Sequence, residues 1–322
     1  MKSLYVGLMS GTSRDSLDGC LVSFENGLNV LACDTLNFSD GYQTSQDQAY
    51  IDKEITNKSI ELVNKLIEIR RDNVVAIAFP GQTISHNDHF SLQAGSPETI
   101  AKETKIPVYS DFRNFDIAKG GKGAPLIPHF HQYLLSEKGT EQLVLNIGGI
   151  CNGTHLKDEE IVHSSDIGPG NCLLDATMRN FNLGKFDSGG LIASKGDVDN
   201  FLLEKLLHEI DFLTYPRADD LSLYLNLMET CKKFLAEKNP EDVLCTFVEL
   251  TVRKIEEYFN FCGAPAKVIF HGGGTENKYL MKRIKEMIKA EISTIDSLIS
   301  SKYVESAAFA YLAFKERAVL FR

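Results

Sequence analysis

Runs of consecutive apolar residues alternate along this chain with segments whose apolar side chains recur every three or four positions. The first pattern is typical of buried strands and the second of amphipathic helices, so their alternation predicts an α/β fold. Strands are expected near residues 4–9, 20–24, 29–37, 74–79, 142–149, 150–156, 160–163 and 267–270. Helices are expected near residues 59–71, 170–181, 197–209, 221–237, 241–261, 277–290 and 304–316.

One arrangement of elements occurs twice. A strand, a glycine turn, a second strand and a short third strand begin at about residue 3 and again at about residue 142. Such a repeat in a chain of 322 residues indicates two related domains. We expect an N-terminal domain over residues 1–135 and a C-terminal domain over residues 136–322, with a cleft between them and the last helix packing back on the first domain. The segment 80–128 is rich in Gly and Pro and is expected to form loops and short helices.

Composition limits the partners and the compartment. The chain has 34 Lys and Arg against 44 Asp and Glu, a formal charge of −10, which argues against a nucleic-acid-binding surface. Its seven cysteines are scattered and include no CxxC pair, a pattern typical of reduced cytosolic thiols rather than of disulfides or a zinc site. The sequence has no signal-peptide pattern and no apolar run of about 18 residues, so we expect a cytoplasmic protein without a membrane span.

The segment GLMSGTSRDSLDG, residues 7–19, is a polar interruption between two apolar runs. An ordinary hairpin turn needs about two to five residues, whereas about ten here offer bare backbone N–H groups, hydroxyls or carboxylates. Two interpretations are open. The segment is either a long polar hairpin loop or a cradle of N–H and O–H donors for phosphate, with Asp nearby for a metal ion.

Glycine-rich turns follow apolar strands at three places in the chain. Because glycine has no Cβ, its backbone can approach phosphate oxygens, so turns in both halves of a duplicated chain predict N–H groups from two domains around one polyphosphate. The alternative is three ordinary tight turns. None has Walker A or Rossmann spacing. The turns are Gly11, Thr12 and Ser13; Asn146, Ile147, Gly148 and Gly149; and Gly272, Gly273 and Gly274.

A carboxylate precedes a predicted helix in the segment SDIGPGN, residues 165–171. Asp166 could serve there as an ordinary helix cap, worth about 1 kcal/mol. The rigid entry made by Gly-Pro-Gly-Asn would instead fix the direction of the carboxylate, as a catalytic base requires. Asp166 is therefore a candidate base.

Polar side chains also follow two other strands, in the segments FPGQT and SDFR that end at Thr83 and Arg113. Ligands lie at strand ends in open α/β sheets, so both segments are candidate places for a ligand. Arg113 offers a planar fork for a carboxylate. The alternative for Arg113 is a structural ion pair with Asp111 or Asp116.

Taken in order, these motifs resemble those of the anhydro-N-acetylmuramic acid kinases. The resemblance runs nearly from end to end, and the combination of MSGTS, NIGG and DIGPGN is highly specific. The matching segments are residues 7–18, 81–83 with His86, 111–113, 123–126, 145–152, 166–171 with 174–176, 272–274, and 305–310.

The resemblance implies a two-domain, duplicated α/β fold of the ribonuclease-H-like type, as in actin, sugar kinases and heat-shock ATPases. It implies an enzyme that uses ATP and Mg²⁺ to open the 1,6-anhydro ring of anhydro-N-acetylmuramic acid by hydrolysis. Water attack at C1 would free O6 as the nucleophile for the γ-phosphoryl group. The product would be N-acetylmuramic acid 6-phosphate, an intermediate of peptidoglycan recycling.

The resemblance also implies roles for single residues. Asp166 would be the base that activates water. Thr83, Arg113 and Glu305 would lie on the substrate side. The residues expected to contact the nucleotide are Gly11, Thr12, Ser13, Arg14, Asp15, Ser16, Leu17 and Asp18, together with Asn146, Gly148, Gly149, Gly272, Gly273 and Gly274. The partners would be the sugar and ATP, and a homodimer is left open.

The chain departs from the family pattern at four places. Arg14 stands where the family usually has an apolar residue. Ser16 stands where the family usually has glycine, and Pro80 where it usually has histidine. Residues 212–223, FLTYPRADDLSL, replace a PPPKSTGRE-like stretch, and the chain is shorter than is usual in the family. A serine with positive φ at position 16 would cost about 1 kcal/mol or more. Two alternatives follow, a related kinase for another sugar and a degenerate ATP-binding sensor.

Overall fold

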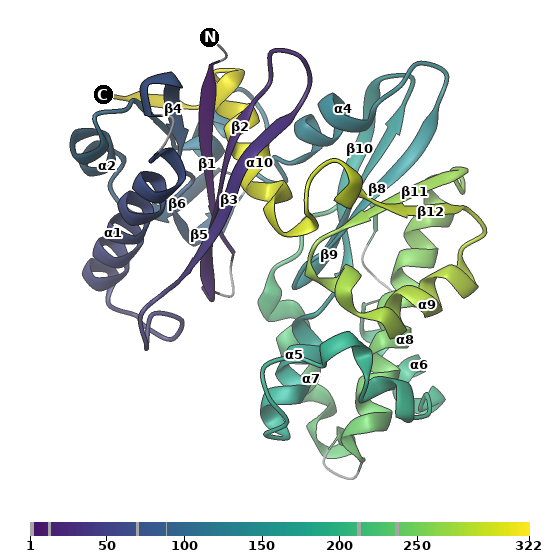
Figure 1. The fold of residues 1–322 in the computed structure, drawn as a ribbon. Helices are drawn as coiled ribbons and strands as arrows, with labels where there is room; N and C mark the ends of the chain where they lie inside the picture. The colour runs from purple at the N-terminus through teal and green to yellow at the C-terminus, as the bar shows by residue number, and fades with distance from the viewer. Residues whose placement is uncertain (1–2, 12–13, 69–70, 88, 211–213, 236–237) are drawn as a thin grey trace. The chain divides into compact units, whose positions relative to one another are not determined.

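The computed structural model describes residues 3–322 except 12–13, 69–70, 88, 211–213 and 236–237 (Figure 1). Its internal contacts divide the chain into two compact units. The first unit contains Met1–Leu134 and Leu298–Arg322, and the second contains Leu135–Ser297. The sequence analysis divides the chain after residue 135 and expects the last helix to pack back on the first domain. The structure assigns residues 298–322, which include that helix, to the first unit.

The first unit is built on a six-stranded sheet with the order β13-β7-β4-β1-β2-β3. β1 (Leu4–Ser10) pairs antiparallel with β2 (Ser16–Ser23), which pairs antiparallel with β3 (Asn29–Asn37). On its other side β1 pairs parallel with β4 (Val74–Ala78), and β4 pairs parallel with β7 (Val108–Ser110). The C-terminal β13 (Val319–Phe321) closes that edge antiparallel to β7.

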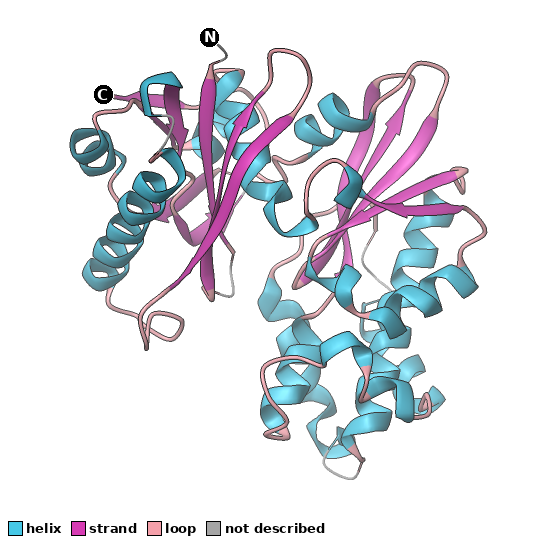
Figure 2. Ribbon diagram, viewed as in Figure 1, coloured by secondary structure: helices cyan, strands magenta, loops and turns pink. Residues whose placement is uncertain are grey.

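Helices cover both faces of this sheet (Figure 2). α1 (Gln48–Ile67) packs on β2 and β3 and against α2 (Pro97–Thr104), around one apolar cluster. α10 (Val304–Phe314) packs on β1, and a second apolar cluster joins it to α3 (Phe112–Ala118). α4 (Pro128–Leu135) follows at the end of the unit.

Two elements of the first unit differ from the sequence prediction. α1 begins eleven residues before the predicted start at residue 59. Asp47 caps this earlier start, and Ile51 and Ile55 extend the buried apolar face of the helix toward its N-terminus. The segment expected to form only loops and short helices contains a hairpin of β5 (Gln82–Asn87) and β6 (Phe90–Ala94). β5 is mostly polar, so it lacks the apolar run that identifies a buried strand.

The second unit is built on a five-stranded sheet with the order β10-β9-β8-β11-β12. β8 (Glu141–Ile147) and β9 (Ile150–Lys157) pair antiparallel, as do β9 and β10 (Glu160–Pro169). β11 (Lys267–His271) pairs parallel with β8 and with β12 (Glu291–Thr294). This order and these directions match β3-β2-β1-β4-β7 of the first unit, so the repeat predicted from the sequence is confirmed as a duplicated α/β topology.

α8 (Pro240–Phe261) is the central helix of the second unit. Asn239 caps its start by accepting from the Asp242 N–H at 2.7 Å, and the helix packs on β10. Around α8 lie α5 (Cys172–Asn180), α6 (Asn200–Ile210) and α9 (Lys278–Met287), and α7 (Leu221–Leu235) packs on α5 and α6. One apolar cluster joins these helices to the sheet.

Short 3-10 helices occupy several connections: η1 (Arg71–Asn73), η2 (Ser188–Gly190), η3 (Ala193–Lys195), η4 (Gly273–Glu276), η5 (Ile295–Ser297) and η6 (Ser301–Tyr303). None of the helices among the described residues has the length and apolar character needed to cross a membrane.

Candidate active site

The polar turn between β1 and β2 is shorter than the sequence suggests. β1 extends to Ser10 and β2 begins at Ser16, so the turn proper is the five residues 11–15, of which Thr12 and Ser13 lie outside the described residues. Gly7 and Gly19 belong to the strands. A Cβ on Gly7 would lie 1.9 Å from the Ser306 carbonyl oxygen of α10, and a Cβ on Gly19 would lie 2.8 Å from a Leu62 methyl carbon of α1. Both glycines therefore serve helix packing.

The turn is tied to the loop that precedes α1. Arg14 has a left-handed φ of 54°, and its Nη1 donates to the Ser45 carbonyl at 3.1 Å. The Asp15 carboxylate accepts a hydrogen bond from the Gln43 amide. Ser16 begins β2 and pairs with Asn37, so it does not have the positive φ considered in the sequence analysis. Arg14 has a positive φ instead.

Gln82 connects this turn to β5. Its side chain is fully buried, accepts from the Ser10 hydroxyl at 2.7 Å and donates to the Gly11 carbonyl at 3.3 Å. The sequence analysis quoted Gln82 within a motif but gave it no role. The signal was a polar side chain at a strand end, and only the structure shows that it positions the neighbouring turn.

The last two residues of the predicted phosphate segment face different surroundings. Leu17 is 1% exposed and belongs to the apolar core, so only its backbone is available to a ligand. The Asp18 carboxylate accepts from the Thr35 hydroxyl at 2.6 Å and lies 3.5 Å from the Lys302 ammonium. Burial raises the pKa of Asp18, and these two partners act against that rise.

Three predicted substrate residues lie in the first unit. Thr83 is half-buried on β5, Arg113 is in α3, and Glu305 is in the first turn of α10. Burial lowers the pKa of Arg113, and the negative charge of Glu305 opposes that change, so the two side chains lie near enough for their charges to interact. Arg113 Nη1 donates to the Gly123 carbonyl at 3.0 Å.

The carboxylates of Asp111 and Asp116, considered from the sequence as ion-pair partners of Arg113, accept hydrogen bonds from other groups. Asp111 accepts from the Asn114 side-chain amide at 2.6 Å. Asp116 accepts from the Gly123 N–H at 2.9 Å. The partner that the structure places near Arg113 is therefore Glu305, from a distant part of the chain.

In the second unit, the β8–β9 turn and the β11–η4 turn lie against each other. A Cβ on Gly272, which has a φ of 89°, would lie 2.2 Å from the Asn146 side-chain oxygen. A Cβ on Gly274 would lie 2.1 Å from an Ile147 methyl carbon. Two of the three predicted glycine turns thus form one packed pair, and their close approach itself requires glycine.

Other glycines of this pair are open. Gly149 and Gly273 are exposed, and a Cβ on either would meet no described atom within 4 Å. The carbonyls of Gly148 and Gly149 accept from the N–H groups that lead into α5, including Asn171 at 2.8 Å. The N–H groups at the start of α5 are therefore occupied by the turn, whereas the exposed glycines leave room for phosphate oxygens.

Asp166 lies in β10 and not immediately before the helix. The predicted third strand ends at residue 163, but β10 continues to Pro169, and Asn171 is the residue that precedes α5. Asp166 is therefore no helix cap. Its N–H donates to the Arg217 carbonyl at 2.9 Å, and its carboxylate accepts from the Asp219 N–H at 2.8 Å.

The environment of Asp166 changes its acidity. Burial raises the pKa of its carboxyl group to about 6; the Asp219 charge adds to the rise, while the Asp219 N–H and Arg217 oppose it. A carboxylate with this pKa is mostly ionised at neutral pH and is more basic than an exposed aspartate. This acidity suits the role of a base that the sequence predicts for Asp166, and the role stays a prediction.

The residues around Asp166 come from the segment that departs from the family pattern. Arg217 and Asp219 form a buried ion pair at 2.9 Å, and the Tyr224 hydroxyl donates to Asp219. The Arg217 side chain also reaches the Ile167 carbonyl, while its Nη1 is buried without a hydrogen-bond partner among the described residues. The sequence analysis missed this network, for which the spacing Arg-x-Asp was the only signal.

Solved structures with a similar fold cover nearly the whole chain. Component A of the (R)-2-hydroxyglutaryl-CoA dehydratase of Acidaminococcus fermentans has a TM-score of 0.53 and 11% identity over 98% of this chain and 99% of its own. A ROK family glucokinase from Streptomyces griseus, in complex with glucose and AMPPNP, has a TM-score of 0.52 and 10% identity over 97% and 100%. With the duplicated sheets, these similarities define the fold as that of the actin-like ATPases and sugar kinases.

Sequence similarity identifies the family. The family model described as anhydro-N-acetylmuramic acid kinase matches residues 3–320. The chain is 36% identical to the anhydro-N-acetylmuramic acid kinase of Gamma-proteobacterium EBAC31A08, over 98% of this chain and 92% of the relative. It is 35% identical to that of Shewanella amazonensis, with the same coverage of the two chains. The chain therefore belongs to the anhydro-N-acetylmuramic acid kinase family and is a kinase that uses ATP.

Proposed function

We propose that this kinase opens the 1,6-anhydro ring of anhydro-N-acetylmuramic acid with water and phosphorylates O6, giving N-acetylmuramic acid 6-phosphate. The main support is Asp166, a half-buried carboxyl group with a pKa raised to about 6, on a strand whose end is bonded to the β8–β9 glycine turn. Ring opening needs a base for water, and phosphoryl transfer needs a phosphate site beside it.

Asp166 is the base in this proposal. Its carboxylate takes a proton from water as the water oxygen forms a bond to C1, and the bond between C1 and the bridging oxygen breaks. The electron pair of that bond remains on O6, which becomes the nucleophile for phosphorus. The Asp219 N–H holds one carboxylate oxygen at 2.8 Å and so orients the group without neutralising it.

The glycine turns bind the nucleotide in this proposal. ATP supplies the phosphoryl group when bound, with Mg²⁺ as its usual counter-ion in such reactions. The exposed backbone of Gly149 and Gly273 fits phosphate oxygens because no side chain blocks it. In the first unit, Gln82 positions the β1–β2 turn, which stays a predicted phosphate contact. We assign no protein ligand to Mg²⁺.

Arg113, Glu305 and Thr83 contact the sugar in this proposal. Muramic acid carries a lactyl carboxylate, which matches the planar fork of Arg113. Burial lowers the pKa of Arg113 and the Glu305 charge opposes that change, and the guanidinium remains charged as arginine does in proteins. The six described cysteines are free thiols, which fits a reaction in the cytoplasm during peptidoglycan recycling.

The test is a direct assay of the purified chain with ATP, Mg²⁺ and anhydro-N-acetylmuramic acid. We expect ADP and the open 6-phosphorylated sugar in equal amounts, and much slower turnover of glucose or N-acetylglucosamine. Faster turnover of another sugar would favour the related-kinase alternative. Binding of ATP without turnover of any sugar would favour the sensor alternative.

A further inference from the structure

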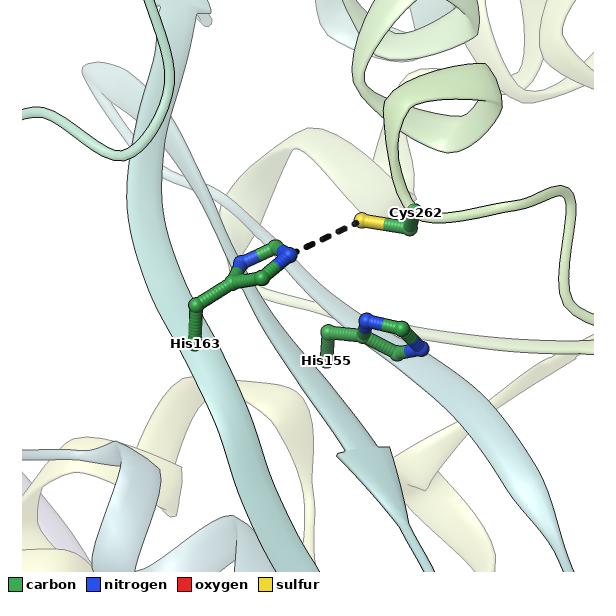
Figure 3. Close-up of side chains that lie close together, drawn as sticks. All are labelled: His155, His163 and Cys262. Carbon is green, nitrogen blue, oxygen red and sulfur yellow. Dashed lines mark hydrogen bonds between the residues drawn. The ribbon is translucent and has the colours of Figure 1, made fainter.

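Three side chains with metal-binding atoms lie close together in the second unit. They are near the ends of β9 and β10 that lie away from the β8–β9 glycine turn. His155 of β9 and His163 of β10 are paired across the two strands, and Cys262 directly follows the last residue of α8 (Figure 3). One nitrogen or sulfur atom from each lies within 4.8 Å of the other two. The Cys262 sulfur is 3.9 Å from His163 Nε2.

The two ring nitrogens of His155 have different partners. Nε2 lies 2.9 Å from a carboxylate oxygen of Glu141, so it carries the proton and donates. The side chain of His155 is only 7% exposed, and its buried Nδ1 has no hydrogen-bond partner among the described residues. Figure 3 shows one nitrogen of the ring on the side of Cys262 and the other turned away. An unpaired buried acceptor is costly, which calls for a ligand at Nδ1.

The hydrogen bonds of His163 indicate its proton position too. Its Nδ1 is 3.1 Å from the Tyr258 hydroxyl oxygen, and that hydroxyl lies 3.4 Å from the Gly153 carbonyl. In the tautomer in which this hydroxyl donates to the carbonyl and accepts from the ring, the proton of His163 is on Nδ1. Nε2 then presents its lone pair toward Cys262.

We propose that His155 Nδ1, His163 Nε2 and Cys262 Sγ bind one Zn²⁺ ion, with water as the fourth ligand. Imidazole and thiolate are the ligands that zinc prefers, and in a tetrahedral site such atoms lie roughly 3.3–3.6 Å apart. The Cys262 sulfur and His163 Nε2 are 3.9 Å apart and all three atoms lie within 4.8 Å of one another, so binding requires side-chain rotations that bring them closer. Glu141 and Tyr258 hold the far side of each imidazole, as outer ligands of zinc sites do.

The protonated thiol is the main alternative state of this cluster. Burial raises the pKa of Cys262 to about 12, so the thiol keeps its proton without a nearby cation. Zinc binding replaces that proton, which passes to solvent as the sulfur–zinc bond forms. The ligands come from two strands and the end of a helix, which explains why the sequence contains no zinc motif. The ion would fix the end of α8 to β10, the strand that carries Asp166.

The test uses the full chain without an affinity tag, stripped of metal and dialysed against Zn²⁺, with bound metal measured by elemental analysis. We expect about one tightly bound ion per chain, and near zero in Cys262→Ser. Two control variants change the same residue types elsewhere. Cys33→Ser lies in the other unit and His208→Gln at an exposed position of α6, and both should still bind about one ion per chain. Equal binding by wild type and Cys262→Ser would overturn the proposal.

Cobalt provides a second readout that does not depend on activity. In the wild type, Co²⁺ should give the visible bands of a tetrahedral site and a near-ultraviolet thiolate charge-transfer band. The charge-transfer band should vanish in Cys262→Ser, and Glu141→Gln should keep it but weaken metal binding about 10- to 100-fold. Should Cys262→Ser fail to fold, His155→Gln repeats the elemental analysis, because it removes one nitrogen ligand and should lose most of the bound zinc. No thiolate band in the wild type would refute the site.

Discussion

The carboxylate of Asp166 accepts the backbone N–H of Asp219 at 2.8 Å. This hydrogen bond orients the carboxylate of Asp166. Because its donor is a backbone N–H, a change of the Asp219 side chain leaves the donor in place. The negative charge of the Asp219 side chain nevertheless raises the pKa of Asp166, and the positive charge of Arg217 lowers it. The segment that departs from the family pattern therefore both orients the proposed base and adjusts its acidity.

The pH dependence of kcat/KM should reveal this carboxyl group. Asp166 must be ionised to accept a proton, and its pKa is raised to about 6. Activity should therefore rise with pH through about 6, and kcat/KM at pH 5 should be about tenfold below its plateau value. An activity that is unchanged between pH 5 and 7 would show that no group of this acidity limits the reaction.

Substitution of Asp219 should move that profile. Asp219→Asn keeps the backbone N–H but removes a negative charge that raises the pKa of Asp166, and it frees Arg217 to lower it further. The acidic limb should shift to lower pH by about one unit. The matched control is Asp220→Asn, whose side chain is exposed and should leave the profile in place. A shift toward higher pH contradicts the charge argument.

Gln82 should matter for both stability and nucleotide binding. Gln82→Leu is similar in size but leaves the buried Ser10 hydroxyl without its acceptor, at a cost of about 1–3 kcal/mol in the free energy of unfolding. The turn also loses its bond at Gly11, so KM for ATP should rise. Urea unfolding and steady-state kinetics measure the two effects. Gln46→Leu, at an exposed position, serves as the control, and equal behaviour of the two variants would exclude a positioning role.

Arg14 tests which parts of the β1–β2 turn bind phosphate. Its guanidinium donates to the Ser45 carbonyl, so Arg14→Leu should cost about 1 kcal/mol of stability. If that bond is its main role, the free energy of ATP binding should change by less than about 0.5 kcal/mol. Calorimetric titration decides the question, because a loss of about 1.5–3 kcal/mol would assign the charge of Arg14 to a phosphate group.

The sequence predicted the duplicated α/β fold because strand and helix periodicities are local properties, and that prediction is confirmed. The sequence could not distinguish glycines that leave room for a ligand from glycines that allow a helix to pack closely on the sheet. Gly7 and Gly19 lie in a polar segment, but residues of α10 and α1, far along the chain, determine why they are glycine. Contacts of that kind are absent from any local pattern.

The surroundings of Asp166 were unpredictable for the same reason. Its motif made it a candidate base, and that role stays a prediction. Its partners Arg217 and Asp219 lie about fifty residues later, in a segment that the sequence analysis treated as a departure from the family. The charge interaction of Arg113 with Glu305 likewise joins distant segments, whereas Asp111 and Asp116, which are closer in sequence, are hydrogen-bonded to other groups.

The central claim is that Asp166 accepts the proton of water during ring opening, and Asp166→Asn tests it most directly. The amide has nearly the same shape and can still accept the Asp219 N–H, but it cannot take a proton. Asp40→Asn, an exposed site in the other unit, is the control. We expect formation of the 6-phosphorylated sugar to fall at least about 100-fold, with the Kd for ATP nearly unchanged. Turnover within a few-fold of the wild type would contradict the account.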